Sequence, residues 1–519
     1  MRWAYSMILL VFLGLLAASP VVAMGAESTP VYGGQLVVAM PAEPSHFDMH
    51  KSTLNYGRYI AWHVNEQLFA VDANFQPTPM LAKSYTVSED GLIYTILLRE
   101  GVLFHNLKEM TSEDVVASLQ RTVALKSLIG AAKIKEVRAT GKYSIEIELS
   151  EPMGSLIFAL SEVRKGAAIY PKETIDAVGT TGIITDYIGT GPYTFAEWRK
   201  AQYVLLKRFD QYSARAEEPN GYGGGKTAYL DEIKFMFVSE PSVRAIGIQA
   251  GDFHFAWPLT ADDNARLRND SNVVSLVSAP FYLTVILSNA STVGLSGNRE
   301  FRRAVQAAVD CEEIMAGLFG DPQIWRLDPG FMWIETAWHS DVGIELYNQA
   351  NPQKAREILA AMGYNGEPVR MITSSEEAVI LNSCLILKQQ LEAAGINIVL
   401  ETYDMATSKN VQKDPNAWDI CTLDSTYRSH PLSLTSIYAS ATTAWSLPEK
   451  DVLVNALMSE ADPVKAFEIW EEIQGLFYSE VPLVKVGDYF DYIGMSADVQ
   501  GYMNTPEYFF WNVWLSNSD

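Results

Sequence analysis

The sequence predicts a mixed α/β protein with more than one lobe. Patterns typical of buried strands alternate with patterns typical of amphipathic helices along most of the chain. No internal repeat or low-complexity tract interrupts the alternation. The chain has 519 residues, far more than one ordinary domain, so two or three lobes are expected.

The N-terminus has the layout of a secretory signal peptide. Arg2 supplies a positive charge, residues 7–18 form an apolar run, and Val21 and Ala23 stand at the −3 and −1 positions of a cleavage site. The run is too short for a lasting anchor, so residues 1–23 are predicted to be removed; an uncleaved N-terminal anchor is the alternative. No later segment has the roughly 18 uninterrupted apolar residues of a membrane span, so the mature chain is expected to be soluble.

The first half of the mature chain has short apolar strands separated by turn residues. A capping box at Thr111 and Asp114 can satisfy free amide groups at the start of a helix that runs to residue 121. Further helices are expected at residues 59–69 and 241–250. The expected strands are residues 34–40, 84–88, 92–98, 142–149, 194–198, 203–209 and 229–237.

A second α/β region opens at residue 282. Asn351 as N-cap and Pro352 at the first helical position begin a helix that Gly363 ends. The other expected elements are a strand at 282–289, a helix at 299–309, and a strand, a helix and a strand at 369–373, 376–394 and 396–403, which form a β-α-β unit.

Charge and cysteine content exclude several classes of protein. The net charge is −23 and the sequence pI is near 4.8, so neither nucleic acid nor an anionic lipid surface is an expected partner. Aromatic residues make up 11%, which suits a cleft that grips organic ligands. Three cysteines leave at least one free thiol, and no disulfide framework is indicated; burial as small apolar side chains is expected.

Motifs for catalysis are missing. The chain has no phosphate-binding G-x-x-x-x-G-K-[ST], no G-x-S-x-G and no C-x-x-C, and the glycine-rich run 221–226 lacks the required spacing. His46 and His50, with Asp48 between them, have a metal-like spacing, but they follow Pro44 in a turn-rich loop. We therefore expect no enzyme activity, no cofactor and no metal site. An exported chain of this kind is predicted to bind a ligand.

Ordered motifs along the chain resemble the family of bacterial extracellular solute-binding proteins that serve peptide, nickel and opine ABC importers. The strongest match lies within residues 79–121, and it departs from the family pattern at Asn106-Leu107, where Asp-Gly is usual. The matching segments are residues 79–85, 90–99, 101–105, 111–121, 188–193, 208–212, 229–233, 249–252, 302–310, 351–364 and 394–396, with Arg244.

The resemblance implies a two-lobed periplasmic binding protein (type II, cluster C) with an extra domain inserted in the first lobe. No cysteine near the signal could carry lipid, so a periplasmic location without a lipid anchor is expected. The implied partners are a small organic ligand and an ABC permease with its ATPase subunits, and the receptor is expected to be a monomer. The expected bounds are 24–65, 171–281 and 488–519 for the first lobe, 66–170 for the inserted domain and 282–487 for the second lobe.

Four segments match regions that line the cleft in this family: 51–56, 287–289, 331–338 and 424–431. Neutral hydrogen-bonding groups in the first two could meet sugar hydroxyls or a ligand backbone. Trp333 and Trp338 could stack on the ligand or could be core residues, and His430 could equally be a satisfied surface histidine. The candidate ligand-binding residues are Ser52, Thr53, Asn55, Tyr56, Asn289, Trp333, Trp338, Asp424, Tyr427, Arg428, Ser429 and His430.

The fourth segment bears on the ligand's charge. Peptide receptors of this family usually carry an aspartate about four residues before a proline; counting back from Pro431, Tyr427 stands there and Arg428 follows. An arginine beside Ser429 suits a carboxylate or phosphate, because guanidinium offers a bidentate fork. The alternative is that Arg428 pairs with an acidic neighbour and never meets ligand.

These residues predict a small anionic organic solute: an opine, a sugar-phosphate conjugate or an acidic modified peptide. An ordinary di- or oligopeptide receptor remains the first alternative, with Asp424 meeting the ammonium after a loop shift. A nickel or haem receptor and an exported hydrolase are further alternatives.

Overall fold

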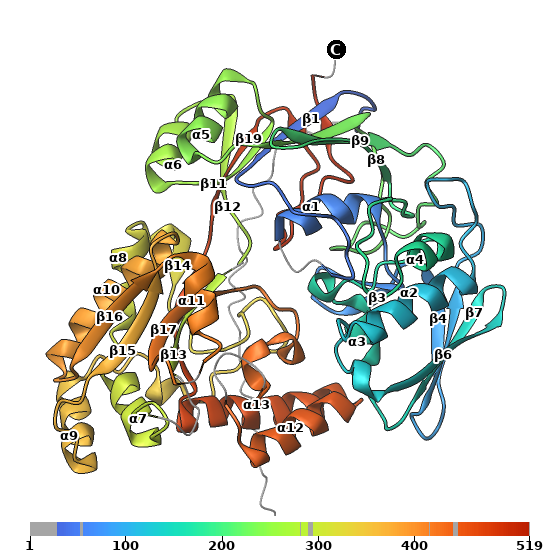
Figure 1. Cartoon of the computed structure of the whole chain (residues 1–519). Helices are drawn as coiled ribbons and strands as arrows, with labels where there is room; N and C mark the ends of the chain where they lie inside the picture. Colours follow the sequence, from blue (N-terminus) through green and yellow to red (C-terminus); the bar gives the residue numbers. More distant parts are fainter. Residues whose placement is uncertain are drawn as a thin grey trace, which may run out of the picture.

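The computed structural model describes residues 29–51, 55–280, 282–288, 294–414, 416–439 and 445–517. The first lobe is built on a seven-stranded mixed sheet, at the top of Figure 1. Its strand order is β12 (Val273–Val277), β19 (Tyr492–Ser496), β11 (Phe255–Leu259), β1 (Gln35–Met40), β10 (Glu232–Phe237), β9 (Tyr203–Arg208) and β8 (Tyr193–Arg199).

The first-lobe sheet has a buried central strand, and helices accompany it. The central strand β1 is parallel to both neighbours, and its residues Leu36, Val38, Ala39 and Met40 are fully buried, in keeping with its apolar sequence. The helices are α1 (Asn55–Val64), α5 (Pro241–Ala250) and α6 (Ala261–Leu267). A short pair, β20 (Val499–Gln500) and β21 (Trp514–Leu515), lies near the C-terminus.

A smaller domain follows the first lobe's α1 along the chain. It contains a four-stranded antiparallel sheet in the order β4 (Ala82–Val87), β5 (Ile93–Leu98), β7 (Ser144–Leu149) and β6 (Ile134–Gly141). The predicted capping box is confirmed, since the Thr111 amide donates to Asp114 over 2.9 Å. The other elements are β2 (Phe69–Val71), β3 (Pro77–Pro79), α2 (Ser112–Ala124), α3 (Leu156–Ser161) and α4 (Lys172–Val178).

The second lobe, at the lower left of Figure 1, has a six-stranded sheet. Its order is β14 (Trp325–Arg326), β18 (Leu483–Tyr489), β13 (Tyr282–Ser288), β17 (Ile420–Thr426), β15 (Val369–Ser374) and β16 (Ile398–Tyr403). The predicted β-α-β unit is confirmed, because β15 and β16 pair in parallel around α10. The helices are α7 (Arg299–Ala308), α8 (Cys311–Phe319), α9 (Pro352–Met362), α10 (Ala378–Ala393), α11 (Met405–Val411), α12 (Pro448–Ser459) and α13 (Pro463–Glu480).

The chain passes between the two large sheets at a double crossing. β12 leads into β13, and β18 returns to β19 through Phe490 and Asp491. The two crossing segments are joined by the Ser278 amide donating to the Asp491 carbonyl (2.8 Å) and the Asp491 amide donating to Ser278 Oγ (2.9 Å). Two such connections that lie side by side form a hinge between the lobes.

The second lobe lies against the inserted domain on the side away from the hinge. The amides of Gly154 and Ser155 donate to the carbonyls of Ser459 and Met458, each over 3.2 Å. The largest buried apolar cluster runs from the first lobe through the inserted domain to α13. The lobes are therefore closed on one another.

One helix boundary differs clearly from the sequence prediction. The helix expected at residues 59–69 is α1, which begins at Asn55 and ends at Val64. Gly189 and Gly191 pack so closely on the backbone of Val64 that a Cβ at either glycine would overlap it. The chain turns toward β2 at this close contact with a distant loop. The apolar spacing of the local sequence gives no information about that contact, so the C-terminal end of the helix was not predicted.

Candidate functional site

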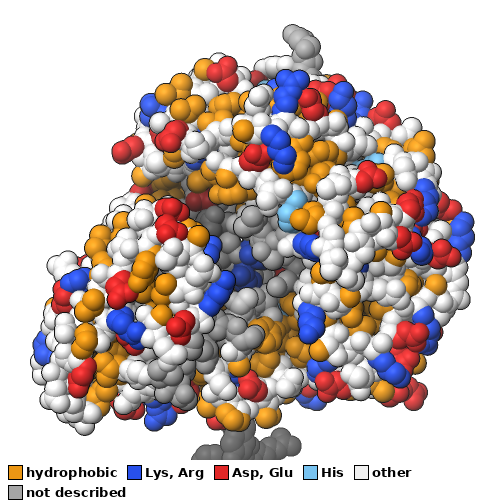
Figure 2. All heavy atoms as spheres, in the orientation of Figure 1, with side chains coloured by type: hydrophobic (Ala, Val, Ile, Leu, Met, Phe, Trp, Pro, Cys, Tyr) orange, Lys and Arg blue, Asp and Glu red, His pale blue; other side chains and the backbone are white. Residues whose placement is uncertain are grey.

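The two lobes face each other across a hollow, which Figure 2 shows with Lys and Arg side chains inside it. The described residues that meet there come from α1, the segment after α3, the end of β17 and the hinge. Ser52, Thr53 and Asn289 lie outside the described residues, so their predicted ligand contacts stay predictions.

Arg428 is half-buried just after β17. Its Nε donates to the Ser433 carbonyl (3.0 Å), and its Nη1 donates to the Thr426 carbonyl and Oγ1 (2.6 Å each) and to the Tyr427 carbonyl (2.9 Å). Burial lowers the pKa of Arg428 to about 10, so the group is still a cation at neutral pH. No hydrogen bond of Nη2 is found in the described part of the chain.

Two further arginines, missed by the sequence analysis, lie on the opposite wall. Arg58 of α1 donates to Asn55 Oδ1 over 2.6 Å and to Glu507 over 2.7 Å. Arg164 donates to the same Asn55 oxygen over 3.4 Å and forms no ion pair with any described residue. Burial, with repulsion from Arg428 and Arg58, lowers the pKa of Arg164 well below its usual range. Asn55, a predicted ligand contact, therefore holds two guanidinium groups together.

Glu162 links the walls. It precedes the turn that carries Arg164 (η2, Val163–Lys165) and accepts hydrogen bonds from Ser429 Oγ (3.4 Å) and from Ser433 Oγ. Ser429 is buried there, so the structure uses this predicted contact to join the lobes.

His430 also joins the lobes. Its ring stacks on Phe158 at 4.1 Å and lies 4.3 Å from the ring of Trp338. Burial lowers the pKa of His430 to about 3, and its Nδ1 accepts from the Leu432 amide. The carbonyl of Trp338 accepts from Trp470 Nε1 over 2.8 Å. Both residues have the contacts of a packed core.

Trp333 and Tyr427 form an aromatic wall on the second lobe. Their rings lie 5.2 Å apart, and Tyr427 also packs at 5.0 Å on Phe75. Both side chains are buried, yet neither Trp333 Nε1 nor Tyr427 Oη has a partner among the residues that the structure describes. Buried donors are nearly always satisfied, so these two groups need an acceptor that the described residues do not supply.

An acidic group lies toward the hinge. Asp424 is exposed on β17 and accepts from Tyr489 Oη over 2.9 Å. Burial, together with the nearby Asp424 carboxylate and against the pull of Arg244, raises the pKa of Asp491 to about 7. Burial and Asp491 likewise raise the pKa of Tyr56. Asp491 was not predicted from the sequence, although an acid in the two-residue link between β18 and β19 was a usable signal.

The His46–His50 loop does not have the contacts of a metal site. Asp48 pairs with Arg121 over 2.8 Å, and His50 lies 2.7 Å from the Ala168 carbonyl. Across the described ranges no three His, Cys, Asp or Glu residues are grouped as metal ligands, and no helix there is long and apolar enough to cross a membrane. The three cysteines are free and buried, as predicted.

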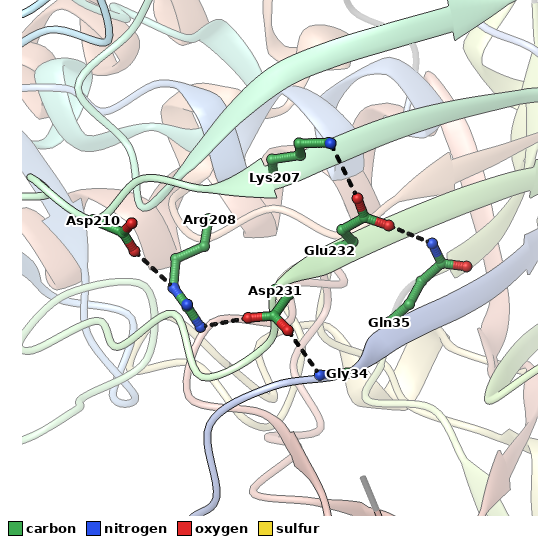
Figure 3. A pocket seen from close by; sticks show the side chains of 7 residues that line it. All are labelled: Gly34, Gln35, Lys207, Arg208, Asp210, Asp231 and Glu232. Atoms are coloured by element: carbon green, nitrogen blue, oxygen red, sulfur yellow. Dashed lines mark hydrogen bonds and ion pairs between the residues drawn. The ribbon is translucent and has the colours of Figure 1, made fainter. Parts of the chain in front are cut away.

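A surface depression where β1 and β10 begin and β9 ends is another charged candidate (Figure 3). Arg208 pairs with Asp210 (2.9 Å) and Asp231 (2.8 Å), and Lys207 pairs with Glu232 (3.3 Å). Each of its charged side chains is paired with an opposite charge, as the dashed contacts in Figure 3 show. Its three carboxylates outnumber its two cations, so this depression does not favour an anion.

A family model decides the class of protein: residues 76–444 match "Bacterial extracellular solute-binding proteins, family 5 Middle". The chain belongs to this family. Relatives include a probable peptide ABC transporter periplasmic-binding protein of Sinorhizobium fredii, 23% identical over 90% of this chain and 91% of that protein. The glutathione-binding protein GsiB of Salmonella paratyphi A is 24% identical over 86% of this chain and 88% of that protein.

Solved structures of the same fold accompany the family match. The oligopeptide-binding protein AppA from Bacillus subtilis, in complex with a nonapeptide, has a TM-score of 0.76 at 21% identity and covers 94% of this chain and 100% of its own. The binding protein AgaA from A. tumefacien R10, in complex with agropinic acid, has a TM-score of 0.76 at 22% identity, covering 93% and 99%.

These comparisons confirm the two-lobed fold and the predicted resemblance. This family 5 protein is a substrate-binding component of an ABC importer, and it is a binding protein rather than an enzyme. The hydrolase alternative is thereby set aside.

Proposed function

We propose that this family 5 protein is a periplasmic receptor that closes around a small anionic organic solute and delivers it to an ABC permease with its ATPase subunits. Opines, sugar-phosphate conjugates and acidic modified peptides have the required chemistry. The observation that carries the proposal is the guanidinium of Arg164, half-buried in the cleft with no ion pair to any described residue. A receptor without a lipid anchor, acting as a monomer, remains part of the proposal.

The charge balance of the cleft supports an anion. Arg58, Arg164 and Arg428 meet the carboxylates Glu162 and Glu507, which leaves one positive charge in excess. Glu507 is engaged by Arg58, and Glu162 is engaged by two serine hydroxyls. A carboxylate or phosphate would supply the missing counter-charge, and each charge-assisted hydrogen bond contributes about 1.5–3 kcal/mol.

The orphan donors support an oxygen-rich solute. Trp333 Nε1 and Tyr427 Oη need acceptors, which hydroxyl, carbonyl or carboxylate oxygens would provide. The glutathione-binding relative and the solved structure in complex with agropinic acid fit this chemistry, because both ligands are acids.

Native mass spectrometry of the protein as purified tests the proposal, with the released compound then identified and titrated back by calorimetry. The expected solute carries a net negative charge, and binding to Arg164→Gln protein should be weaker. Retention of a neutral or cationic solute, or equal binding to the variant, would refute the anionic class.

A second candidate is an ordinary di- or oligopeptide receptor. Asp424 is exposed and accepts a hydrogen bond from the Tyr489 hydroxyl. Burial and the Asp424 carboxylate raise the pKa of Asp491 at the hinge, and a ligand ammonium would be favoured there because it would offset the repulsion between the two acids. Calorimetry with a mixed peptide pool separates the candidates. Tight peptide binding that Asp424→Asn weakens, while Arg164→Gln leaves it unchanged, would favour the peptide receptor.

A further inference from the structure

Three guanidinium groups from three parts of the chain meet where the lobes close. Arg58 and Arg164 share the acceptor Asn55 Oδ1, so these two groups are neighbours on one wall. Arg428 belongs to the second lobe, and Glu162 connects its segment to that wall through Ser433 Oγ. Arg428 therefore joins the other two charges only when the second lobe lies against the inserted domain.

The available carboxylates do not neutralise this arrangement. Arg58 is paired with Glu507, whereas neither Arg164 nor Arg428 has an ion pair within the described ranges. Burial is the main cause that lowers the pKa of Arg164, and repulsion from Arg428 and Arg58 lowers it further. Closing the empty cleft thus brings two cations without ion pairs together out of water, with Glu162 as the carboxylate that attracts both.

Contacts that need no ligand favour closure. Ser155 Oγ donates to the Met458 carbonyl over 2.9 Å, and the rings of Phe158 and His430 stack at 4.1 Å. With the Glu162–Ser433 bond, these contacts join the lobes on the side of the cleft away from the hinge. They would hold an empty receptor closed unless another interaction opposed them.

We infer that Arg164 and Arg428 form a charge gate, a like-charge pair that opposes closure of the empty cleft and is relieved by an anionic group that bridges the lobes. This inference rests on the proposed anionic ligand and adds the mechanism that makes closure depend on it. A ligand shifts a two-state equilibrium only through different affinities for the two states. The gate supplies that difference, because the anion contacts both guanidinium groups only in the closed form.

The test measures closure without ligand, on the full mature chain stripped of bound solute. Spin labels at Val87→Cys of β4 and Val452→Cys of α12 report the distance between inserted domain and second lobe, since both positions are exposed and the native cysteines are buried. Distance distributions are compared for the parent, Arg164→Gln, Arg428→Gln and the charge-retaining Arg164→Lys. Arg303→Gln on α7, an exposed arginine in a local ion pair, is the matched control.

The gate predicts that Arg164→Gln raises the closed-to-open ratio of the empty protein, on the order of threefold to tenfold. Arg164→Lys and Arg303→Gln should match the parent. Raising NaCl to about 1 M should shift the parent toward closure more than it shifts Arg164→Gln, because salt weakens the repulsion between these half-buried groups, although less than between exposed charges. Arg164 makes one long hydrogen bond, so its loss is not expected to unfold the chain, and the salt titration of the parent needs no variant at all.

Equal closed fractions for parent and both glutamine variants, with no response to salt, would overturn the gate while leaving anion binding intact. A gate that responds as expected in a protein whose released solute is cationic would overturn the proposed anionic ligand alone.

Discussion

Replacing the two unpaired arginines separately distinguishes ligand binding from structural support. Arg428 makes four hydrogen bonds to its own loop, whereas Arg164 makes one, at 3.4 Å. Arg164→Gln should therefore weaken solute binding by about 1.5–3 kcal/mol, roughly 10- to 150-fold, at almost no cost in stability. Arg428→Gln should cost similar affinity and, in addition, about 1–3 kcal/mol of unfolding free energy, because it leaves loop carbonyls unsatisfied.

Calorimetry with the solute released from the parent gives the affinities, and urea unfolding of the stripped proteins gives the stabilities. Arg303→Gln on α7 should change neither quantity, since its ion pair is exposed and local. If Arg164→Gln bound the solute within twofold of the parent, the assignment of this guanidinium to the ligand would be wrong. A stability loss in Arg164→Gln equal to that in Arg428→Gln would contradict the difference in their contacts.

Three further predictions concern the aromatic wall, the hinge and the closing surface. Trp333→Phe keeps an aromatic ring but removes the orphan N–H, so solute affinity measured by calorimetry should fall about five- to tenfold. The smaller ring leaves space in a buried site, so the thermal unfolding midpoint should also fall. The pKa of Asp491 in the folded protein is raised to about 7, so this carboxyl stabilises the fold below its unfolded pKa and loses that contribution as pH rises toward 7. In Asp491→Asn, unfolding midpoints measured from about pH 4 to pH 8 should show a smaller loss of stability over this range. Gly154→Ala should weaken solute binding at least tenfold, since its Cβ would overlap the Glu460 carbonyl in the closed form.

Each has a result that would count against it. Unchanged solute affinity in Trp333→Phe would show that the orphan N–H does not meet the ligand. An Asp491→Asn protein with the parent's pH profile would remove the hinge acid as the titrating group. For Gly154, the control is Gly141→Ala in the same domain, whose nearest contact would be an ordinary 3.8 Å; equal affinities for the two variants would contradict the role of the closing surface.

Part of the candidate site could be predicted from the sequence. The motif order led to the segment at 424–431, and counting from Pro431 selected Tyr427 and Arg428. Both line the cleft region, with an orphan hydroxyl and a guanidinium group. The next residues, Ser429 and His430, turn instead toward Glu162 and Phe158, because successive side chains of an irregular loop point in different directions.

The remaining site residues could not be predicted in this way. Arg58, Arg164 and Arg428 are separated by more than a hundred residues at each step, and each sits in a local sequence with no distinguishing pattern. Their shared surroundings arise from closure of one lobe on another. The same holds for the orphan Trp333 N–H, since whether a buried donor is satisfied depends on neighbours from other elements.

The sequence by itself determined the class of protein and the local structure: an α/β chain, its capped helices, its β-α-β unit and its family motifs. These follow from apolar periodicity, capping residues and turn residues, which act over a few positions. Only the tertiary structure decided which charges remain unpaired. Electrostatic balance depends on distances between groups far apart in the chain, and those distances exist only once the two lobes have closed.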